Sequence, residues 1–249
     1  MANWSDPRSV GAAPAGDVGA RSAAVDAGLR SYMLSVYNYM GSGVLLTGIV
    51  ALLFASSGAA QSIMMSPGIL KWVIMLSPLA FILVMNFGIN RMSTMTLQAC
   101  FWGFATVMGL SMSTIFLVYT GASIAQTFFA TSAAFAGLSL WGYTTKKDLS
   151  GMGTFLIMGV VGLLVASIIN IFMQSGTMNL VISFVGVLLF AGLTAYDTQR
   201  IKADYIEFAY ADGTEEAGKR SVMDALGLYL NFVNLFQLLL SFMGQRNSD

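Results

Sequence analysis

The sequence contains two long stretches without any acidic residue. No Asp or Glu occurs between Asp26 and Asp148, and none occurs between Asp148 and Asp197. An acid at the centre of a bilayer costs about 2.5–3.5 kcal/mol on insertion scales, so such gaps are typical of membrane spans. Only 10% of the residues are charged, compared with about 25% in a soluble domain. The chain is therefore expected to be an α-helical membrane protein with very little that folds in water.

Seven apolar stretches have the roughly 20 residues that a spanning helix needs. Short segments that contain Pro, Gly, Asn or Lys separate them. The fold class that follows is an all-α integral membrane protein with seven transmembrane helices in the lipid bilayer. The predicted spans cover about residues 39–59, 69–90, 95–119, 122–145, 151–173, 178–200 and 222–243.

Two polar segments lie outside these spans. Residues 1–30 are rich in Ala, Gly, Ser and Asp and have no apolar core, so they are not a secretory signal. We expect them to be a disordered cytoplasmic tail, followed by a seven-helix membrane domain over residues 31–249. Residues 201–221 hold several charged side chains and are expected to form the only sizeable soluble connector.

The distribution of Lys and Arg predicts the orientation of the chain, because short cytoplasmic loops carry an excess of both. With a cytoplasmic N-terminus, ten basic residues lie inside and two, Lys71 and Arg246, lie outside. Seven spans place the C-terminus outside, whereas six spans and a re-entrant final segment would return it inside; the sequence leaves both open. The ten inside residues are Arg8, Arg21, Arg30, Arg91, Lys146, Lys147, Arg200, Lys202, Lys219 and Arg220.

Composition also excludes several functions. The 12 basic and 12 acidic residues give a net charge of zero, so nucleic acid is not an expected partner. The chain has no histidine, which excludes a Ser-His hydrolase, a His-ligated zinc site and an imidazole proton relay. A single cysteine, Cys100, cannot form an intramolecular disulfide. We expect neither an enzyme nor a bound cofactor.

The sixth predicted span carries a polar stripe that ends in a carboxylate. Asn179, Ser183, Gly186, Thr194 and Asp197 fall within about 80° of one another on a helix. Asp197 is the only acid embedded within an apolar run. An acid inside a membrane span is a functional candidate by default.

A second polar stripe lies on the seventh predicted span. Asp224, Gly227, Asn231, Asn234 and Ser241 fall within about 100° of one another, and the opposite face is mostly Leu, Phe and Val. The two stripes can face each other across neighbouring helices. They would then line a narrow polar path, with contributions from Ser183, Thr194 and Asn234, or would simply join the helices by hydrogen bonds.

A carboxylate within a membrane requires a partner, and two arginines are candidates. Arg200 lies three residues after Asp197 and can reach it on the same helix. Arg91 lies at the cytoplasmic end of the second predicted span, at a similar depth, and could reach Asp197 across the bundle. Alternatively, Arg91 extends to the lipid headgroups and only marks the topology.

Three segments together resemble the transmembrane Bax inhibitor motif family. They are FAGLTAYDTQRIK in the sixth span, ALGLYLNFVNLFQLLL in the seventh, and LRSYMLSVYNYMGSGVLLTGIVALL around the first. The resemblance covers residues 29–244 and implies a fold with six helices around a central seventh. It also implies a pH-sensitive calcium leak, a bacterial inner-membrane location for a chain of this type, and, in animals, a link to the suppression of cell death. Some bacterial relatives are associated with a membrane-bound AAA protease.

The resemblance also assigns roles to three residues. A carboxylate in the sixth helix and one in the seventh form a proton-sharing pair that senses pH, and the first of these matches Asp197. The second falls on Asn231, where the family commonly has Asp. The arginine that latches the closed state matches Arg91. Because two close carboxylates raise each other's affinity for protons, an amide at position 231 is expected to weaken a switch at neutral pH.

The sequence is compatible with three functions. The first is a leak channel for calcium, or its pH-sensitive regulator, in which Asp197 is the gate and contacts the permeant calcium ion through its oxygens. The second is a partner or inhibitor of a membrane-bound AAA protease, which would contact the tail and the connector at 201–221. The third, an intramembrane aspartyl protease, is suggested by Tyr196-Asp197 but lacks the Gly-x-Gly-Asp setting for a second acid.

Overall fold

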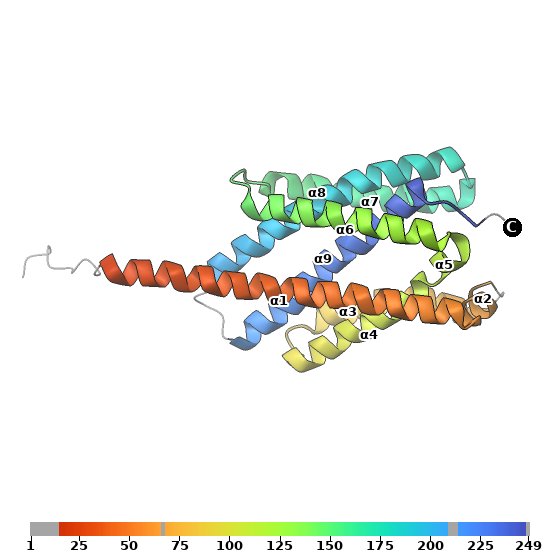
Figure 1. Cartoon of the computed structure of the whole chain (residues 1–249). Coiled ribbons are helices and arrows are strands. Elements are labelled where there is room, and N and C mark those ends of the chain that lie inside the picture. The colour runs from red at the N-terminus through yellow and green to blue at the C-terminus, as the bar shows by residue number, and fades with distance from the viewer. Residues whose placement is uncertain (1–14, 66–67, 209–213, 248–249) are drawn as a thin grey trace, which may run out of the picture.

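The computed structural model describes residues 15–65, 68–208 and 214–247, and these residues are almost entirely helical. Seven helices are long and apolar enough to cross a membrane, which confirms the predicted fold class. One span is made by α4 and α5 together, and α2 is a short extra helix. In chain order (Figure 1) the helices are α1 (Ala15–Ser56), α2 (Ala59–Met64), α3 (Ile69–Gly88), α4 (Thr94–Met112), α5 (Thr114–Val118), α6 (Gly121–Thr144), α7 (Ser150–Met173), α8 (Gly176–Phe208) and α9 (Thr214–Met243).

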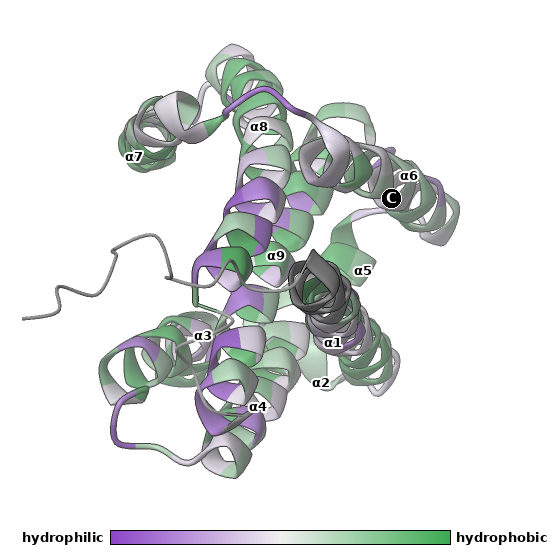
Figure 2. Cartoon of the chain, turned by 90° about the vertical axis from the view of Figure 1, so that its left-hand side faces the viewer, coloured by the Kyte–Doolittle hydropathy of each residue, from purple (hydrophilic) through white to green (hydrophobic). Residues whose placement is uncertain are grey.

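The last helix, α9, is the centre of the bundle. It packs against α1, α4, α6 and α8, whereas α3 and α7 pack chiefly on α4 and α8 at the periphery (Figure 2). Half of the apolar window of α9 is buried, against 11% for α3 and 6% for α7. The central seventh helix that the resemblance implied is therefore confirmed, and the side chains of α3 and α7 mostly face lipid.

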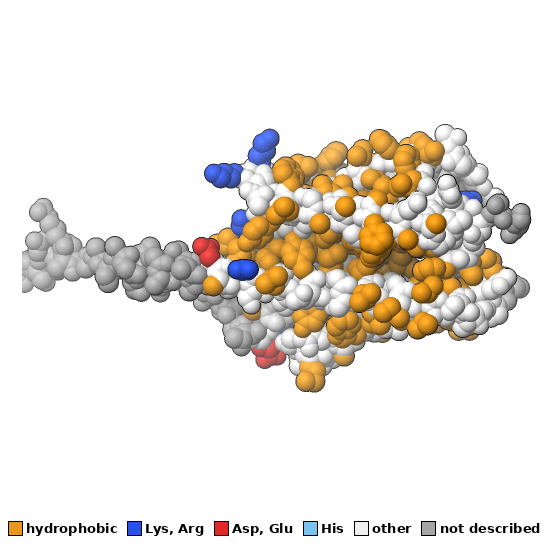
Figure 3. Space-filling view, in the orientation of Figure 1, with side chains coloured by type: hydrophobic (Ala, Val, Ile, Leu, Met, Phe, Trp, Pro, Cys, Tyr) orange, Lys and Arg blue, Asp and Glu red, His pale blue; other side chains and the backbone are white. Residues whose placement is uncertain are grey.

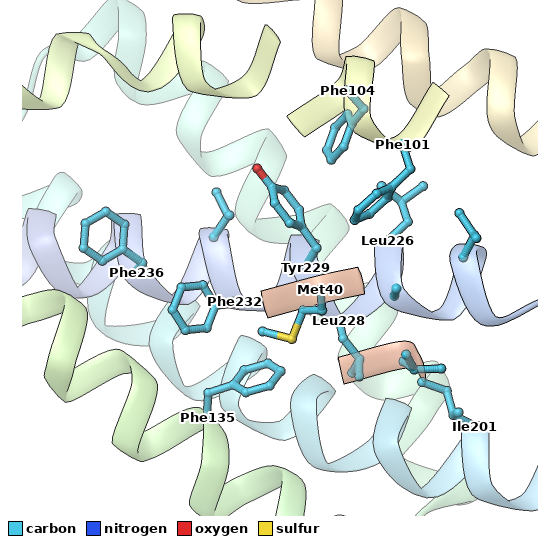
Figure 4. Close-up of a cluster of buried hydrophobic side chains, with 14 of the residues drawn as sticks. Met40, Phe101, Phe104, Phe135, Ile201, Leu226, Leu228, Tyr229, Phe232 and Phe236 are labelled. Carbon is cyan, nitrogen blue, oxygen red and sulfur yellow. The ribbon is translucent and has the colours of Figure 1, made fainter. Parts of the chain in front are cut away.

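The largest fully buried side chain, Tyr229 of α9, anchors the core. Its ring meets Phe101 and Phe104 of α4 edge to face, with centroids 6.2 and 5.1 Å away (Figure 4). Its hydroxyl lies 2.7 Å from Oγ1 of Thr47 in α1, so the buried polar group has a hydrogen-bond partner. Tyr229 thereby fixes α1, α4 and α9 against one another.

Close contact between α6 and α8 depends on a glycine. A Cβ atom at Gly142 would lie 2.3 Å from the carbonyl oxygen of Ala195, far inside van der Waals contact. Small residues allow membrane helices to approach this closely. The contact places α6 beside the segment of α8 that carries Asp197, two residues further on.

The first helix begins earlier than the sequence analysis predicted. Its span was expected to start near residue 39, but α1 begins at Ala15 and its membrane-compatible portion begins at Val25. Residues 15–30 were expected to be disordered, whereas α1 already covers them and continues into the span without a break. Residues 1–14 of the expected tail lie outside the described part of the chain.

The expected soluble connector at 201–221 is also mostly helical. The helix α8 continues to Phe208 and α9 begins at Thr214, while residues 209–213 lie outside the described residues. In the first turns of α9, Lys219 pairs with Glu215 at 3.6 Å and with Glu216 at 3.0 Å. Such pairs, and acids near a helix N-terminus, stabilise the first turns of α9, which precede its apolar part.

The two ends of the bundle differ in charge. One end, on the left in Figure 1, holds the start of α1 and the α3–α4 and α6–α7 connections. Lys and Arg side chains gather there in Figure 3, and we call it the basic end. The helix α9 runs without interruption from this end to the opposite one, so it spans the bundle and is not re-entrant.

Candidate functional site

The polar stripes predicted on the sixth and seventh spans do face each other. The helices α8 and α9 pack together extensively, and their side chains form three layers along the contact. We call this contact the α8–α9 seam. From the basic end outward, its layers are a buried acid with its partners, an apolar layer and a polar cavity.

The inner layer is the pair of Asp197 and Asn231. The Nδ2 atom of Asn231 donates to Oδ2 of Asp197 at 2.7 Å, and the two residues are only 5% and 9% exposed. The other carboxylate oxygen lies 3.1 Å from Nη2 of Arg200. The amide of Asn231 donates a hydrogen bond and the guanidinium of Arg200 forms an ion pair, so both contacts suit an ionised carboxylate. The structure thus brings together two of the three residues to which the resemblance assigned roles.

The third of these residues, Arg91, is not part of the pair. It is exposed in the connection between α3 and α4, and its side chain forms no ion pair with any residue that the structure describes. Because α3 packs chiefly on α4, Arg91 is held away from α8. In this structure the expected contact between Arg91 and Asp197 is absent, and Arg200, the local candidate, is the partner of Asp197.

The middle layer is apolar. Phe190 and Leu193 of α8 pack with Leu235 of α9 in a cluster whose members are at most 8% exposed. Phe190 lies seven residues before Asp197, which is about 10 Å along a helix. Thr194, a predicted path-lining residue, is fully buried and donates to the carbonyl of Phe190 at 2.8 Å, so its hydroxyl serves its own helix.

The outer layer is a polar cavity of about 290 Å³ between α7, α8 and α9. Asn179 and Ser183 of α8 each donate to Oγ of Ser241 in α9, at 3.2 and 3.1 Å. Asn234 also lines this cavity, while its Nδ2 donates to the carbonyl of Leu230 at 2.8 Å. The predicted path-lining residues Ser183 and Asn234 therefore lie on the cavity, and Phe190 borders it on the side of the apolar layer.

A second acid, Asp224 of α9, lies near this pair. Its carboxylate accepts a hydrogen bond of 2.6 Å from the hydroxyl of Tyr32 in α1, and it lies within electrostatic range of Asp197 and Arg200. Asp224 was placed on the polar stripe but at the edge of the predicted span. Asp224 lies two helical turns before Asn231, and this spacing could have indicated that it belongs to the site. Its partner Tyr32 could not be predicted, because the first span was expected to begin at about residue 39.

A chain of hydroxyl groups reaches the same region from α1 and α6. The hydroxyl of Tyr37 bonds to Oγ of Ser139, which lies 2.9 Å from Oγ1 of Thr198. Thr198 directly follows Asp197, so these bonds join α1, α6 and α8 beside the buried acid. The sequence offered no signal for this chain, since single Ser and Thr residues are common in membrane helices.

Calcium contact at Asp197 stays a prediction. Among the described residues, no three or more His, Cys, Asp or Glu side chains come together in a way that could hold a metal ion. The residue facing Asp197 supplies an amide, and both carboxylate oxygens already accept contacts from side chains. An ion at this position would therefore have to displace at least one of them.

Fold and site together define a polytopic membrane protein whose two most buried helices enclose an acid–amide pair. The family model described as "Inhibitor of apoptosis-promoting Bax1" matches residues 29–248, almost the whole described chain. The chain belongs to this Bax inhibitor-1-like family, which confirms the resemblance drawn from the sequence.

Bacterial relatives match over nearly their whole length. An "Uncharacterized protein RP147" of Rickettsia prowazekii is 44% identical over 89% of this chain and 92% of that protein. The "Inner membrane protein YbhL" of Escherichia coli K12 is 40% identical over 88% of this chain and 94% of its own length. An "Uncharacterized membrane protein SpyM3_0260" of Streptococcus pyogenes is 32% identical over 89% and 96%. These names agree with an integral membrane protein.

The buried pair should be energetically coupled. Replacing Asn231 with Ala leaves the carboxylate of Asp197 without its amide donor, which should lower the free energy of unfolding by about 1–3 kcal/mol. In a double-mutant cycle with Asp197→Ala, which removes the acceptor, the two effects should differ from additivity by about 0.5–3 kcal/mol. Denaturant unfolding in detergent micelles measures both quantities.

Asn234→Ala is the matched control for this cycle. It removes an amide from the same helix, but one that bonds to its own backbone at Leu230. It should therefore combine additively with Asp197→Ala. Additivity for Asn231 as well would contradict the assigned pair.

Proposed function

We propose that the protein is a cation leak channel, with calcium as the permeant ion and the α8–α9 seam as its path. The observation that carries this proposal is the acid–amide pair of Asp197 and Asn231, buried in line with a polar cavity and separated from it by apolar side chains. If the hydrogen bond between Asp197 and Asn231 only joined the two helices, a polar cavity further along the same seam would not be needed. The protein acts by letting an ion pass and performs no chemical step.

The oxygens of the seam suit a hard cation. Calcium takes carboxylate, amide carbonyl and hydroxyl oxygens as ligands. Asp197 supplies one carboxylate, and amide and hydroxyl oxygens come from Asn231, Asn234 and Ser183. A single carboxylate is too few for tight binding, so the arrangement favours passage over storage.

On this proposal, two features close the path. The layer of Phe190, Leu193 and Leu235 excludes water, as hydrophobic constrictions do in channels. Arg200 places a positive charge beside Asp197, which opposes an arriving cation. The side chain of Arg200 is 43% exposed, so it can leave Asp197 for the headgroup region without being stranded in lipid. Arg200 then has the latching role that the resemblance gave to Arg91.

Proton uptake by Asp197 provides a pH-sensitive release. A neutral carboxyl group no longer attracts the guanidinium of Arg200, so the latch weakens as the pH falls. The amide of Asn231 donates to the ionised carboxylate and thus holds the latched form to lower pH than a second acid would. The proposed leak therefore increases on acidification.

The alternative of a protease partner depends on other parts of the chain. Its expected contacts were the N-terminal tail and the connector at 201–221. Residues 1–14 and 209–213 lie outside the described part of the chain, and the rest of the connector extends α8 and α9. The α8–α9 seam, in contrast, lies within the described residues, and its buried acid and polar cavity favour the ion path.

The orientation proposed for the protein is a cytoplasmic N-terminus in a bacterial inner membrane. It rests on the excess of Lys and Arg at the basic end and on the seven spans, which place the C-terminus on the other side. A reporter active only outside the cytoplasm should therefore give a signal when fused after Asp249. A signal from a cytoplasmic reporter at that position would overturn this orientation.

Substitutions at the acid–amide pair should move the pH dependence of calcium flux. In Asn231→Asp, two carboxylates at this distance resist joint ionisation, so the pH midpoint of the leak should rise. In Asp197→Asn, the carboxyl group that holds Arg200 is gone, so the pH dependence that it confers on the leak should be lost. The measurement is the initial calcium flux into liposomes across a pH series for both variants and the unchanged protein.

Flux through the fully open state should change little in Asn231→Asp, because the oxygens of the path remain. An unchanged pH midpoint in this variant, in protein shown to be folded, would contradict the proposed latch. The absence of calcium flux in the unchanged protein at every pH would contradict the channel itself.

A further inference from the structure

A groove between α1 and α6 opens toward the lipid. It has a volume of about 700 Å³ and extends from Arg30 to Gly41 on α1 and from Ser132 to Tyr143 on α6, with Phe232 of α9 as its floor. Apolar side chains line the hollow between these helices in Figure 3. We call it the α1–α6 groove. Neither the ion path nor the packing of the seven spans accounts for it.

The length of the groove matches one leaflet of a bilayer. Eleven residues separate its ends on each helix, which corresponds to about 17 Å at a rise of about 1.5 Å per residue. Half of a hydrocarbon core of about 30 Å is about 15 Å. The groove therefore covers the acyl region of the leaflet at the basic end, and a second hollow of about 300 Å³ continues between α1 and α6 beyond Phe232.

Two cations flank the mouth of the groove at that end. Arg30 of α1 is exposed and forms no ion pair with a described residue, and Asp26, one turn earlier, is not bonded to it. Across the mouth, Nζ of Lys202 donates to the carbonyl of Tyr143 at 2.9 Å and lies 4.7 Å from the centre of its ring. Tyr143 thereby holds Lys202 on the α6 side. Positive charge lies where a headgroup would lie, and apolar surface where an acyl chain would lie.

We propose that the α1–α6 groove binds an anionic phospholipid of the leaflet at the basic end. One acyl chain lies along the groove on Phe232, and the phosphate lies between Arg30 and Lys202. Under the proposed orientation this is the cytoplasmic leaflet. The lipid-binding proposal itself does not depend on ion conduction.

The bound lipid would contact residues that border the seam. Its acyl chain would lie on Phe232, the neighbour of Asn231 in the chain. It would also cover Tyr37, whose hydroxyl starts the chain of hydrogen bonds that passes through Ser139 to Thr198. The lipid therefore lies one layer of side chains away from Asp197.

Native mass spectrometry of the whole protein in detergent tests this proposal. The protein is mixed with phosphatidylglycerol or with phosphatidylcholine that carries the same acyl chains. One phosphatidylglycerol should be retained in preference to phosphatidylcholine. In Arg30→Gln that preference should fall about fivefold, the effect of one cation beside an anionic headgroup. Lys71→Gln, which removes a cation from the opposite end, should leave it unchanged.

A second pair of variants tests the groove itself. Ala136→Trp fills the groove and should abolish retention of the lipid, whereas Ala133→Trp, exposed on the same helix outside the groove, should not. Equal retention of both lipids, or an unchanged preference in Arg30→Gln, would overturn the proposal. So would a dimer that Ala136→Trp dissociates, since a second copy would then be the occupant.

Discussion

The structure depends on the burial of one carboxylate between its two most buried helices. An ionised Asp in a membrane interior is tolerated only when it is paired and hydrogen-bonded, and Asp197 has both kinds of contact, from Arg200 and Asn231. These contacts fix the rotation of α8 and α9 about their axes. That rotation aligns the outer polar cavity with the acid and brings Phe190 and Leu235 together between them.

The remaining helices position this seam and connect it to the lipid. Tyr229 secures α9 against α1 and α4 on one side, and the close approach at Gly142 secures α6 against α8 on the other. Between α1 and α6 the packing leaves a groove, and a hydrogen bond from Tyr37 of α1 to Ser139 of α6 joins its two sides. The same arrangement that supports the buried acid therefore leaves a lipid-facing surface within one layer of it.

Hydropathy predicted the seven spans, because the absence of acids and the apolar runs are direct consequences of the lipid environment. The embedded acid and the two helical stripes predicted that the last two spans face each other, and the family resemblance singled out Asp197 and Asn231. Hydropathy could not show where a helix continues beyond its apolar part, so the early start of α1 and the contact of Tyr32 with Asp224 were missed. Arg91 was chosen by its depth and by the family resemblance, and neither reveals that α3 packs outside α4.

The most direct test of the account is calcium flux through a protein whose apolar layer has been opened. Phe190→Ala removes the largest side chain between the polar cavity and Asp197, and Leu188→Ala, on the same helix, removes a side chain that is 58% exposed toward lipid. With folded protein in liposomes, Phe190→Ala should increase the initial calcium flux at neutral pH, and Leu188→Ala should leave it unchanged. Equal flux in both variants and the unchanged protein would contradict a path along the α8–α9 seam.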